Sequence, residues 1–335
     1  MQALRIHTHG GPEVLKLEAA PDPVPAPGEV LVRVRACALN HLDLFIREGI
    51  PGIKIGLPRI LGCDIAGERA DNGERVVVAP GVGCGHCHFC LDGRDNECRQ
   101  YQVFGYQRDG GCAELVAVPE RCLIPMPPQL DFVQAASMPL VFLTAWNMLV
   151  RRAGVQPGQR VLVWAASSGV GIAAVQIAKF FGCPVIATAG GAAKLKLAHD
   201  LGADEVVDHY DAATPVSKAV KRWAPEGVDI VVEHVGQASW EQSVRSLAPG
   251  GTLVTCGATT GYDATIDLRF LFSRQLRLIG SYMGRRADLD TVFALIAAGR
   301  LRPVVDRTFP LAQAPDAHRY LAAKKQFGKV VLTLA

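Results

Sequence analysis

The sequence has almost no excess of charge of either sign and no long apolar run that is free of polar residues, Gly or Pro. Its 35 basic residues exceed its 32 acidic residues by three. This near balance argues against a dedicated nucleic-acid or membrane-surface binder. The first residues lack the apolar stretch of a secretion signal, so we expect a cytoplasmic protein. Two uncharged runs, residues 132–150 and 161–178, are interrupted by polar residues and favour buried elements over membrane spans.

Repeats and low-complexity segments are also missing. The 34 glycines and 21 prolines follow no regular period and therefore mark turns rather than a fibrous structure. Apolar residues make up 49% of the chain, which excludes general disorder. A length of 335 residues predicts about two domains. Ten cysteines in a large chain without a secretion signal favour free thiols or metal ligands over a disulfide framework.

The first third of the chain is typical of an all-β domain. Residues 30–35 alternate apolar and charged side chains, as a half-buried strand does. Residues 75–78 and 114–118 have the composition of further short strands, and Gly and Pro separate these segments. Such a succession predicts a barrel-like domain.

After a proline-rich connector at residues 125–128, the pattern changes to strands that alternate with helices. The expected strands are residues 161–164, 185–188, 230–232 and 253–255, and the expected helices are residues 171–181 and 192–201. Continuous apolar strands that alternate with helices predict a parallel sheet covered on both faces. The expected fold class is therefore α/β with an additional β-rich domain.

The segment between the first strand and the first helix of this series has the composition of a phosphate-binding turn. Small residues let the backbone approach a pyrophosphate, and the helix N-terminus offers free N–H groups and the positive end of a dipole. Ala165 and Ser167 stand where glycines are frequent, so the motif alone fits an ordinary turn equally well. Its place in a strand–helix series favours dinucleotide binding by Ser167, Ser168, Gly169, Val170 and Gly171.

The second strand of the series ends without an acidic residue. An enzyme that prefers NADH usually places a carboxylate there to bind the ribose 2′-hydroxyl. Here Ala189, Gly190 and Gly191 follow the strand, and Lys194 lies within reach of its end. The sequence therefore favours NADPH over NADH. The alternative for Lys194 is an ordinary solvated position on a helix.

Four of the ten cysteines form a compact C-x2-C-x2-C-x7-C pattern. Four thiolates can close a tetrahedral zinc site with no open position, which is a structural site. Unrelated free thiols and an iron–sulfur cluster are the alternatives. The close spacing argues against the first, and nothing else in the sequence indicates the electron-transfer partners of the second. We expect a structural Zn²⁺ bound by Cys84, Cys87, Cys90 and Cys98.

This combination resembles the medium-chain dehydrogenase/reductase superfamily over essentially the whole chain. The resemblance is carried by residues 10–15 (GGPEVL), residues 165–171 (AASSGVG) and residues 328–332 (GKVVL). It implies a chaperonin-10-like β-barrel substrate domain over residues 1–125, completed by residues 272–335. Between them, residues 126–271 would form a Rossmann NADP(H)-binding domain. It also implies a homodimer or homotetramer, in which residues 276–279, apolar except for Arg277, would form a pairing edge.

Two branches of this superfamily differ at the catalytic site. Zinc alcohol dehydrogenases bind a second, catalytic zinc through a cysteine, a Gly-His-Glu segment and a further cysteine or carboxylate. Here Asn40, the segment Gly62-Cys63-Asp64 and Leu140 stand at these positions. Residues 40–43 (NHLD) and 143–146 (LTAW) instead resemble quinone oxidoreductases, which have no catalytic zinc. The four-cysteine segment is unusual for that branch.

The resemblance implies catalytic roles for Asn40, as a hydrogen-bond donor to the substrate oxygen, and for Asp43, which would orient the site or the nicotinamide ribose. Each has an ordinary alternative, a turn cap for Asn40 and a helix N-terminal charge for Asp43. Without a Lewis-acid zinc, a small quinone or α,β-unsaturated carbonyl is the easier substrate, since hydrogen bonds can stabilise the charge on its oxygen. The other implied cofactor contacts are Thr144, Lys194, Tyr210, Gly236, Gly257, Ser281 and Lys329.

Three functions stay open from the sequence. The favoured function is an NADPH-dependent reductase of quinones or enones without catalytic zinc, because Leu140 cannot bind a metal. The second is a zinc alcohol dehydrogenase whose metal site uses an altered set such as His41, Cys63 and Asp64. The third is a non-catalytic NADPH-binding sensor, since Phe45 stands where several quinone oxidoreductases have a tyrosine.

Overall fold

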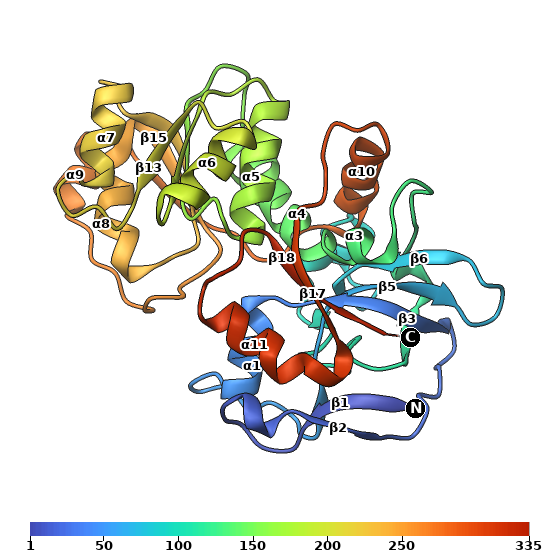
Figure 1. Ribbon diagram of the computed structural model, residues 1–335. Helices are drawn as coiled ribbons and strands as arrows, with labels where there is room; N and C mark the ends of the chain where they lie inside the picture. Colours follow the sequence, from blue (N-terminus) through green and yellow to red (C-terminus); the bar gives the residue numbers. More distant parts are fainter. Residues whose placement is uncertain (335) are drawn as a thin grey trace. The chain divides into compact units, whose positions relative to one another are not determined.

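The computed structural model describes residues 1–334 and divides into two compact units. Unit 1 comprises Met1–Leu140 and the chain from Arg285 onward, and unit 2 comprises Val141–Gly284. Figure 1 shows the chain coloured along its sequence. Within residues 1–334, no helix combines the length and the apolar composition needed to cross a membrane.

Unit 1 is built on a seven-stranded sheet in the order β10-β6-β5-β3-β18-β17, and β9 also pairs with β3. Its strands are β3 (Glu29–Ala38), β5 (Asp64–Arg69), β6 (Arg75–Val78), β9 (Leu115–Pro119), β10 (Leu123–Pro125), β17 (Val305–Pro310) and β18 (Lys329–Thr333). The alternation expected over residues 30–35 is confirmed, because Val32 and Val34 are buried and Arg33 is exposed. Strand β18 pairs with β3, with Leu332 opposite Cys37, so the red end of the chain lies beside blue β3 in Figure 1.

Smaller elements complete unit 1. A three-stranded sheet is formed by β1 (Gln2–Ile6), β2 (Lys16–Ala19) and β4 (Arg59–Ile60). The α-helices are α1 (His41–Glu48), α2 (His88–Leu91), α3 (Phe132–Ala136), α10 (Arg286–Ala297) and α11 (Ala314–Ala322). The 3₁₀ turns are η1 (Pro12–Val14), η2 (Asp95–Glu97), η3 (Glu120–Cys122) and η5 (Leu311–Gln313). Helix α4 (Pro139–Trp146) begins in unit 1 and continues into unit 2.

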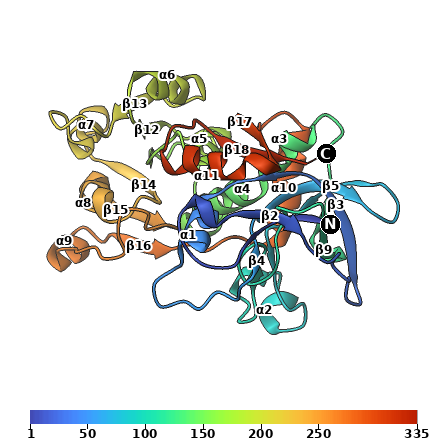
Figure 2. The same cartoon turned by 60° about the horizontal axis from the view of Figure 1, so that its bottom comes forward.

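A lobe carries the four closely spaced cysteines. It begins at the short pair β7 (Gly81–Val82) and β8 (Gln102–Val103), and it contains α2 and η2. Figure 2 shows α2 projecting away from the strands of unit 1. None of the ten cysteines, all of which lie within residues 1–334, forms a disulfide.

Unit 2 is a six-stranded parallel sheet in the order β13-β12-β11-β14-β15-β16. Its strands are β11 (Val161–Val163), β12 (Val185–Ala189), β13 (Glu205–Asp208), β14 (Val228–Glu233), β15 (Leu247–Thr255) and β16 (Arg277–Gly280). Its helices are α5 (Gly169–Phe180), α6 (Ala192–Asp200), α7 (Val216–Trp223), α8 (Gln237–Ser246), α9 (Leu268–Ser273) and the π-helix η4 (Asn147–Ala153). Numbered within the unit, the order is 3-2-1-4-5-6, that of a Rossmann sheet.

The strands and helices expected between residues 161 and 255 are present, with ends shifted by one or two residues. The exception is the strand expected at residues 253–255, which is the end of β15 and begins six residues earlier, at Leu247. The reason is that these strands are continuously apolar and bury both faces. Leu162, Ile186, Val231 and Leu253 are all fully buried in one core. The expected parallel sheet covered by helices is confirmed.

The boundaries expected at residues 125/126 and 271/272 fall earlier in the chain than the division in the structure. Helix α3 packs on β3 and β5 and therefore belongs to unit 1. Strand β16 pairs in parallel with β15 and therefore belongs to unit 2. Tertiary packing, which the local pattern does not report, determines both boundaries.

Candidate active site

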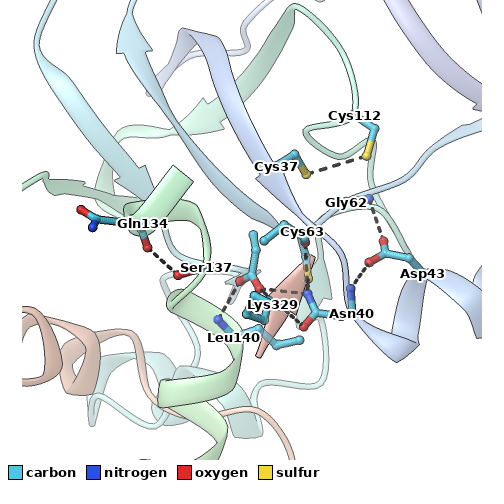
Figure 3. Close-up of polar contacts among 12 residues, drawn as sticks. Cys37, Asn40, Asp43, Gly62, Cys63, Cys112, Gln134, Ser137, Leu140 and Lys329 are labelled. Carbon is cyan, nitrogen blue, oxygen red and sulfur yellow. Dashed lines mark hydrogen bonds and ion pairs between the residues drawn. The ribbon is translucent and has the colours of Figure 1, made fainter. Parts of the chain in front are cut away.

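The end of β3 and the start of α1 place Asn40 and Asp43 in the interior of unit 1. Asp43 is 2% exposed. Its two carboxylate oxygens accept hydrogen bonds from the backbone amides of Asn40, at 2.7 Å, and Gly62, at 2.9 Å (Figure 3). Burial raises the pKa of Asp43 to about 6, against the opposing influence of these amides and of Lys329. Asp43 therefore joins the start of α1 to the segment that precedes β5.

A buried ion pair lies beside Asn40. Lys329, at the start of β18, is 4% exposed, and Asp64, at the start of β5, is fully buried. The Lys329 ammonium donates to Asp64 Oδ2 at 2.8 Å and to Asn40 Oδ1 at 2.5 Å. Asp64 also accepts hydrogen bonds from Asn40 Nδ2 at 2.9 Å and from the Leu140 backbone amide at 2.7 Å. Figure 3 labels Asn40, Leu140 and Lys329 around this carboxylate. Buried charges persist when they are paired and hydrogen-bonded in this way. We call Asn40, Asp64 and Lys329 the buried cluster.

The contact between Lys329 and Asn40 was not foreseen from the sequence. Lys329 is predicted above only as a cofactor contact, and 289 positions separate it from Asn40. Asp64 is considered above only as an altered metal ligand, whereas here it accepts three hydrogen bonds. The only sign of Lys329 in the sequence is a charged residue at the start of the last apolar strand. Local spacing cannot identify Asn40 as its partner.

Zinc alcohol dehydrogenases have their catalytic metal ligands at the positions of Asn40, residues 62–64 and Leu140. Here these residues are joined by hydrogen bonds and do not form a set of metal ligands. Leu140 offers only its backbone N–H, which is bonded to Asp64. Burial raises the pKa of the Cys63 thiol well above its usual range, with Asp64 and Asp43 adding to the effect. Within residues 1–334, His41, Cys63 and Asp64 do not come together as a group of potential ligands.

The four cysteines of the lobe do form such a group. Their Sγ atoms all lie within 4.8 Å of one another. The Sγ atom of Cys90 is 3.9 Å from that of Cys84 and 3.6 Å from that of Cys87. A tetrahedral zinc with Zn–S bonds of about 2.3 Å requires S–S distances of about 3.8 Å. The spacing of the thiols therefore fits a zinc ion.

The electrostatics of the lobe are compatible with a bound cation. Backbone amides, first that of His86 and also that of Cys87, outweigh burial and lower the pKa of the Cys84 thiol to about 6. Burial and the neighbouring sulfurs raise the pKa of the Cys90 thiol to about 12. Four thiols this close cannot all ionise without a positive charge among them, and a divalent metal supplies that charge.

In unit 2, the predicted phosphate turn connects β11 to α5. Ser168 is the N-cap of α5, and its Oγ accepts a hydrogen bond from the Gly171 amide at 2.9 Å. A Cβ atom on Gly171 would lie 2.4 Å from the carbonyl oxygen of Ala165, so only glycine fits beneath the turn. The first turn of a helix leaves backbone N–H groups without a helical partner, and here they belong to residues 169–170. The turn fits the phosphate-binding role expected for it.

The residues predicted to surround the adenosine ribose lie near the end of β12. The Tyr210 ring packs on Gly190, where a Cβ atom would lie 2.4 Å from the ring. Lys194 lies in the first turn of α6. The sequence analysis missed Asp208 at the end of β13, whose carboxylate accepts the amides of Gly191 at 3.1 Å and Tyr210 at 2.9 Å. An acidic residue is therefore present at this edge, but on the neighbouring strand.

Gly236 and Gly257 lie on the loops that follow β14 and β15. Gly236 has a φ of +98°. A Cβ atom would lie 2.8 Å from Ala258 Cα at Gly236 and 2.7 Å from the His234 carbonyl oxygen at Gly257. Close packing of the two loops thus accounts for both glycines. Buried Glu233, which the sequence analysis also missed, holds the first loop by accepting the amides of Val235, at 2.6 Å, and Gly236, at 3.1 Å.

The remaining predicted contacts of unit 2 lie on α4 and after β16. Thr144 is 8% exposed on α4. Ser281 accepts a hydrogen bond from Asn147 Nδ2 at 2.9 Å, and its backbone amide donates to the Thr255 carbonyl at 2.8 Å. Their roles toward a cofactor stay predictions.

Comparison with known proteins assigns the family. Residues 26–128 match the alcohol dehydrogenase GroES-like domain, and residues 169–298 match the zinc-binding dehydrogenase family. The quinone oxidoreductase of Sus scrofa is 30% identical over 341 residues, covering 100% of this chain and 98% of that protein. The chain belongs to the medium-chain dehydrogenase/reductase superfamily. It is an oxidoreductase with a GroES-like domain and a Rossmann-type domain, as the resemblance implied.

Other members of the superfamily are similar to this chain but carry different names. A solved structure described as an NAD-dependent alcohol dehydrogenase is 43% identical, with a TM-score of 0.96 and 100% coverage of both chains. The spectinabilin polyketide synthase system protein NorB of Streptomyces orinoci is 38% identical over 98% of this chain, which spans only 14% of NorB. The reaction of this superfamily member must therefore be argued from its own residues.

Proposed function

We propose that this oxidoreductase transfers a hydride from NADPH to a small quinone or α,β-unsaturated carbonyl without a catalytic metal. We also propose that one structural Zn²⁺ holds the lobe through Cys84, Cys87, Cys90 and Cys98. The observation that carries the proposal is the buried cluster. It places an asparagine, a carboxylate and a lysine in mutual contact around the positions where zinc alcohol dehydrogenases of the superfamily have metal ligands.

The chemistry asks little of the protein beyond position and hydrogen bonding. Bound NADPH would supply the hydride, which adds to a substrate carbon while negative charge develops on the substrate oxygen. The Asn40 amide is the donor that we assign to this oxygen, because donors fixed in advance stabilise developing charge without reorganisation. Asp43 holds the Asn40 backbone through the 2.7 Å hydrogen bond. Water is a sufficient source for the final proton.

The coenzyme assignment is supported by the edge formed by β12 and β13. Strand β12 ends in Ala189 and is followed by two glycines, so no carboxylate from this strand opposes a 2′-phosphate. The carboxylate of Asp208 is already engaged by two backbone amides. Lys194 offers a positive charge to the phosphate. NADH is the alternative coenzyme, favoured by the name of the 43% identical structure.

Two further expectations from the sequence remain part of this proposal. Strand β16 is one of the two edge strands of the sheet in unit 2, and it contains residues 277–279 of the segment expected to pair two copies into a homodimer or homotetramer. The cytoplasmic location stays a prediction.

The second candidate is a zinc-dependent alcohol dehydrogenase. It is favoured by the zinc-binding dehydrogenase family match and by the name of the similar structure. We rank it lower because the only clustered ligand set within residues 1–334 is the four-cysteine group, which leaves no open position for a substrate.

Metal content and turnover together test the proposal. Zinc per chain would be measured by elemental analysis of chelator-washed protein, with Cys84→Ser as the variant expected to lose the structural ion. NADPH oxidation would then be followed with a panel of quinones and enones. One zinc and turnover of this panel support the reductase, whereas two zincs and NAD-linked alcohol oxidation support the second candidate. NADPH binding with no turnover of either substrate class would leave the sensor as the better account.

A further inference from the structure

We infer that Lys329 and Asp64 are positioning residues that fix the side-chain amide of Asn40 and present one of its N–H groups to the substrate oxygen. This inference rests on the proposed function, in which Asn40 is the donor to that oxygen. It gives Lys329 and Asp64 a role in the reaction. The sequence did not connect either residue with Asn40.

The two partners force a single orientation on the amide. The ends of an asparagine side chain have similar shapes, so their assignment follows from the groups that they contact. An ammonium can only donate and an ionised carboxylate can only accept. Asn40 Oδ1 lies 2.5 Å from Lys329 Nζ, and Asn40 Nδ2 lies 2.9 Å from Asp64 Oδ2. If the amide were flipped, its NH₂ group would face the Lys329 ammonium and its oxygen would face the Asp64 carboxylate, and neither contact could be a hydrogen bond.

This orientation leaves one amide hydrogen weakly bonded. The bond to Asp64 uses one of the two hydrogens on Nδ2. The contacts left for the second are weak, because the Ala38 carbonyl oxygen is 3.4 Å away and Cys63 Sγ, at 3.6 Å, is a poor acceptor. A donor at such distances gains little from its present partners. It is therefore the N–H that a substrate oxygen can take with the smallest loss of existing hydrogen bonding.

The lysine also makes this donor stronger. The positive charge of Lys329 next to Oδ1 polarises the amide and increases the partial positive charge on its hydrogens. This effect is large where water is excluded. Lys329 itself is 4% exposed, and its ammonium already has two acceptors. Two of its three N–H donors are thus engaged within the buried cluster, and we assign it a role through Asn40. Asp64 is held in place in turn by the Leu140 amide at 2.7 Å.

Kinetics on a double-mutant cycle test the coupling. We expect Lys329→Met to lower kcat with a quinone by about 10- to 100-fold, the range known for residues that orient metal ligands. We expect KM for NADPH to stay unchanged, which distinguishes this role from the direct cofactor contact predicted from the sequence. In an Asn40→Ala background the same substitution should change kcat less than about twofold, because the group on which it acts is gone. Lys329→Arg keeps the charge and should recover part of the activity. A loss in the Asn40→Ala background as large as in the wild type would overturn the inference.

A matched control exists in unit 2. Lys179, at the opposite end of α5 from the phosphate turn, forms an ion pair with Asp204 at 2.8 Å. Lys179→Met also removes a lysine from a carboxylate and should leave kcat unchanged. If it lowers kcat as much as Lys329→Met, the effect is a general consequence of breaking an ion pair and the inference fails.

A second readout does not depend on turnover. The sequence contains only four asparagines, so ¹⁵N labelling of asparagine gives four side-chain amides, and Asn40→Ala identifies that of residue 40. We expect Lys329→Met to shift this amide strongly and to leave the other three in place, whereas an unchanged Asn40 signal would contradict the inference. If the wild type shows this signature but reduces no quinone or enone, the proposed function fails while the positioning role stands. If Lys329→Met does not fold, the double variant Asp64→Asn/Lys329→Met takes its place in these experiments, because it removes both buried charges together.

Discussion

The candidate site residues of the two units are held in place by different means. In unit 1 they are side chains held by other groups in the interior, since Asn40, Asp43, Asp64 and Lys329 are all at most 7% exposed and hydrogen-bonded. In unit 2 the phosphate turn is a backbone structure, held by the Ser168 cap and by the small size of Gly171. The difference predicts that single substitutions are costly in unit 1 and mild in unit 2.

Breaking the lobe should have the largest effect. We expect Cys84→Ser to lose the zinc and to lower the free energy of unfolding by about 4 kcal/mol or more, because the free energy of zinc binding contributes directly to the stability of the folded lobe. Elemental analysis and urea unfolding measure the two effects. Cys183→Ala, which removes a buried thiol of unit 2, is the control and should keep the zinc. Full zinc content in Cys84→Ser would show that this thiol is not a ligand.

The buried carboxylate of unit 1 should make stability depend on pH. Burial raises the pKa of Asp43 from 3.8 to about 6, so the folded chain binds more protons than the unfolded chain between pH 4 and 6. Its contribution to the free energy of unfolding therefore falls as the pH rises through this window, by about 3 kcal/mol in total. Urea unfolding of Asp43→Asn from pH 4 to 7 should lack this decrease.

Asp204 of unit 2 provides a control, because its pKa is shifted in the opposite direction to that of Asp43. Burial raises its pKa, but the hydrogen bonds from Lys179 and the Val185 amide outweigh burial and lower it overall. The stability that Asp204 contributes is therefore complete above its unfolded pKa and is lost only as the pH falls below about 4. Asp204→Asn should leave the change between pH 4 and 6 as in the wild type. Equal changes in the free energy of unfolding between pH 4 and 6 for the wild type and Asp43→Asn would contradict the assignment to Asp43.

The same contrast explains what could be predicted from the sequence. The phosphate turn and the strands and helices of unit 2 are visible because each signal lies within a few residues, as with Ser168 and Gly171. The bond between Lys329 and Asn40 spans 289 positions, and no local pattern reports it. Asp208 was missed because a carboxylate was sought only on β12, and the parallel pairing of β12 with β13 brings it to that edge.

The coenzyme edge of unit 2 should respond more weakly than the sites of unit 1. If Lys194 binds the 2′-phosphate, Lys194→Ala should lower the preference for NADPH over NADH by about tenfold, or about 1.4 kcal/mol, with little effect on stability. The ratio of kcat/KM for the two coenzymes measures it. Lys196→Ala, two residues along the same helix and paired with Asp200, is the matched control. Equal effects of both variants would mean that general charge, and not Lys194, sets the preference.

The smallest effect is expected at the cap of α5. Ser168→Ala removes the acceptor of the Gly171 amide, 2.9 Å away, and should lower the free energy of unfolding by about 1 kcal/mol, as for other N-cap serines. Ser168→Thr keeps an acceptor oxygen and should retain most of this stability. Because the phosphate is expected to be bound by backbone N–H groups, the dissociation constant for NADPH should change by no more than about tenfold in Ser168→Ala. A much larger loss of affinity without a loss of stability would mean that the hydroxyl itself binds the coenzyme, and unit 2 would then depend on a side chain as unit 1 does.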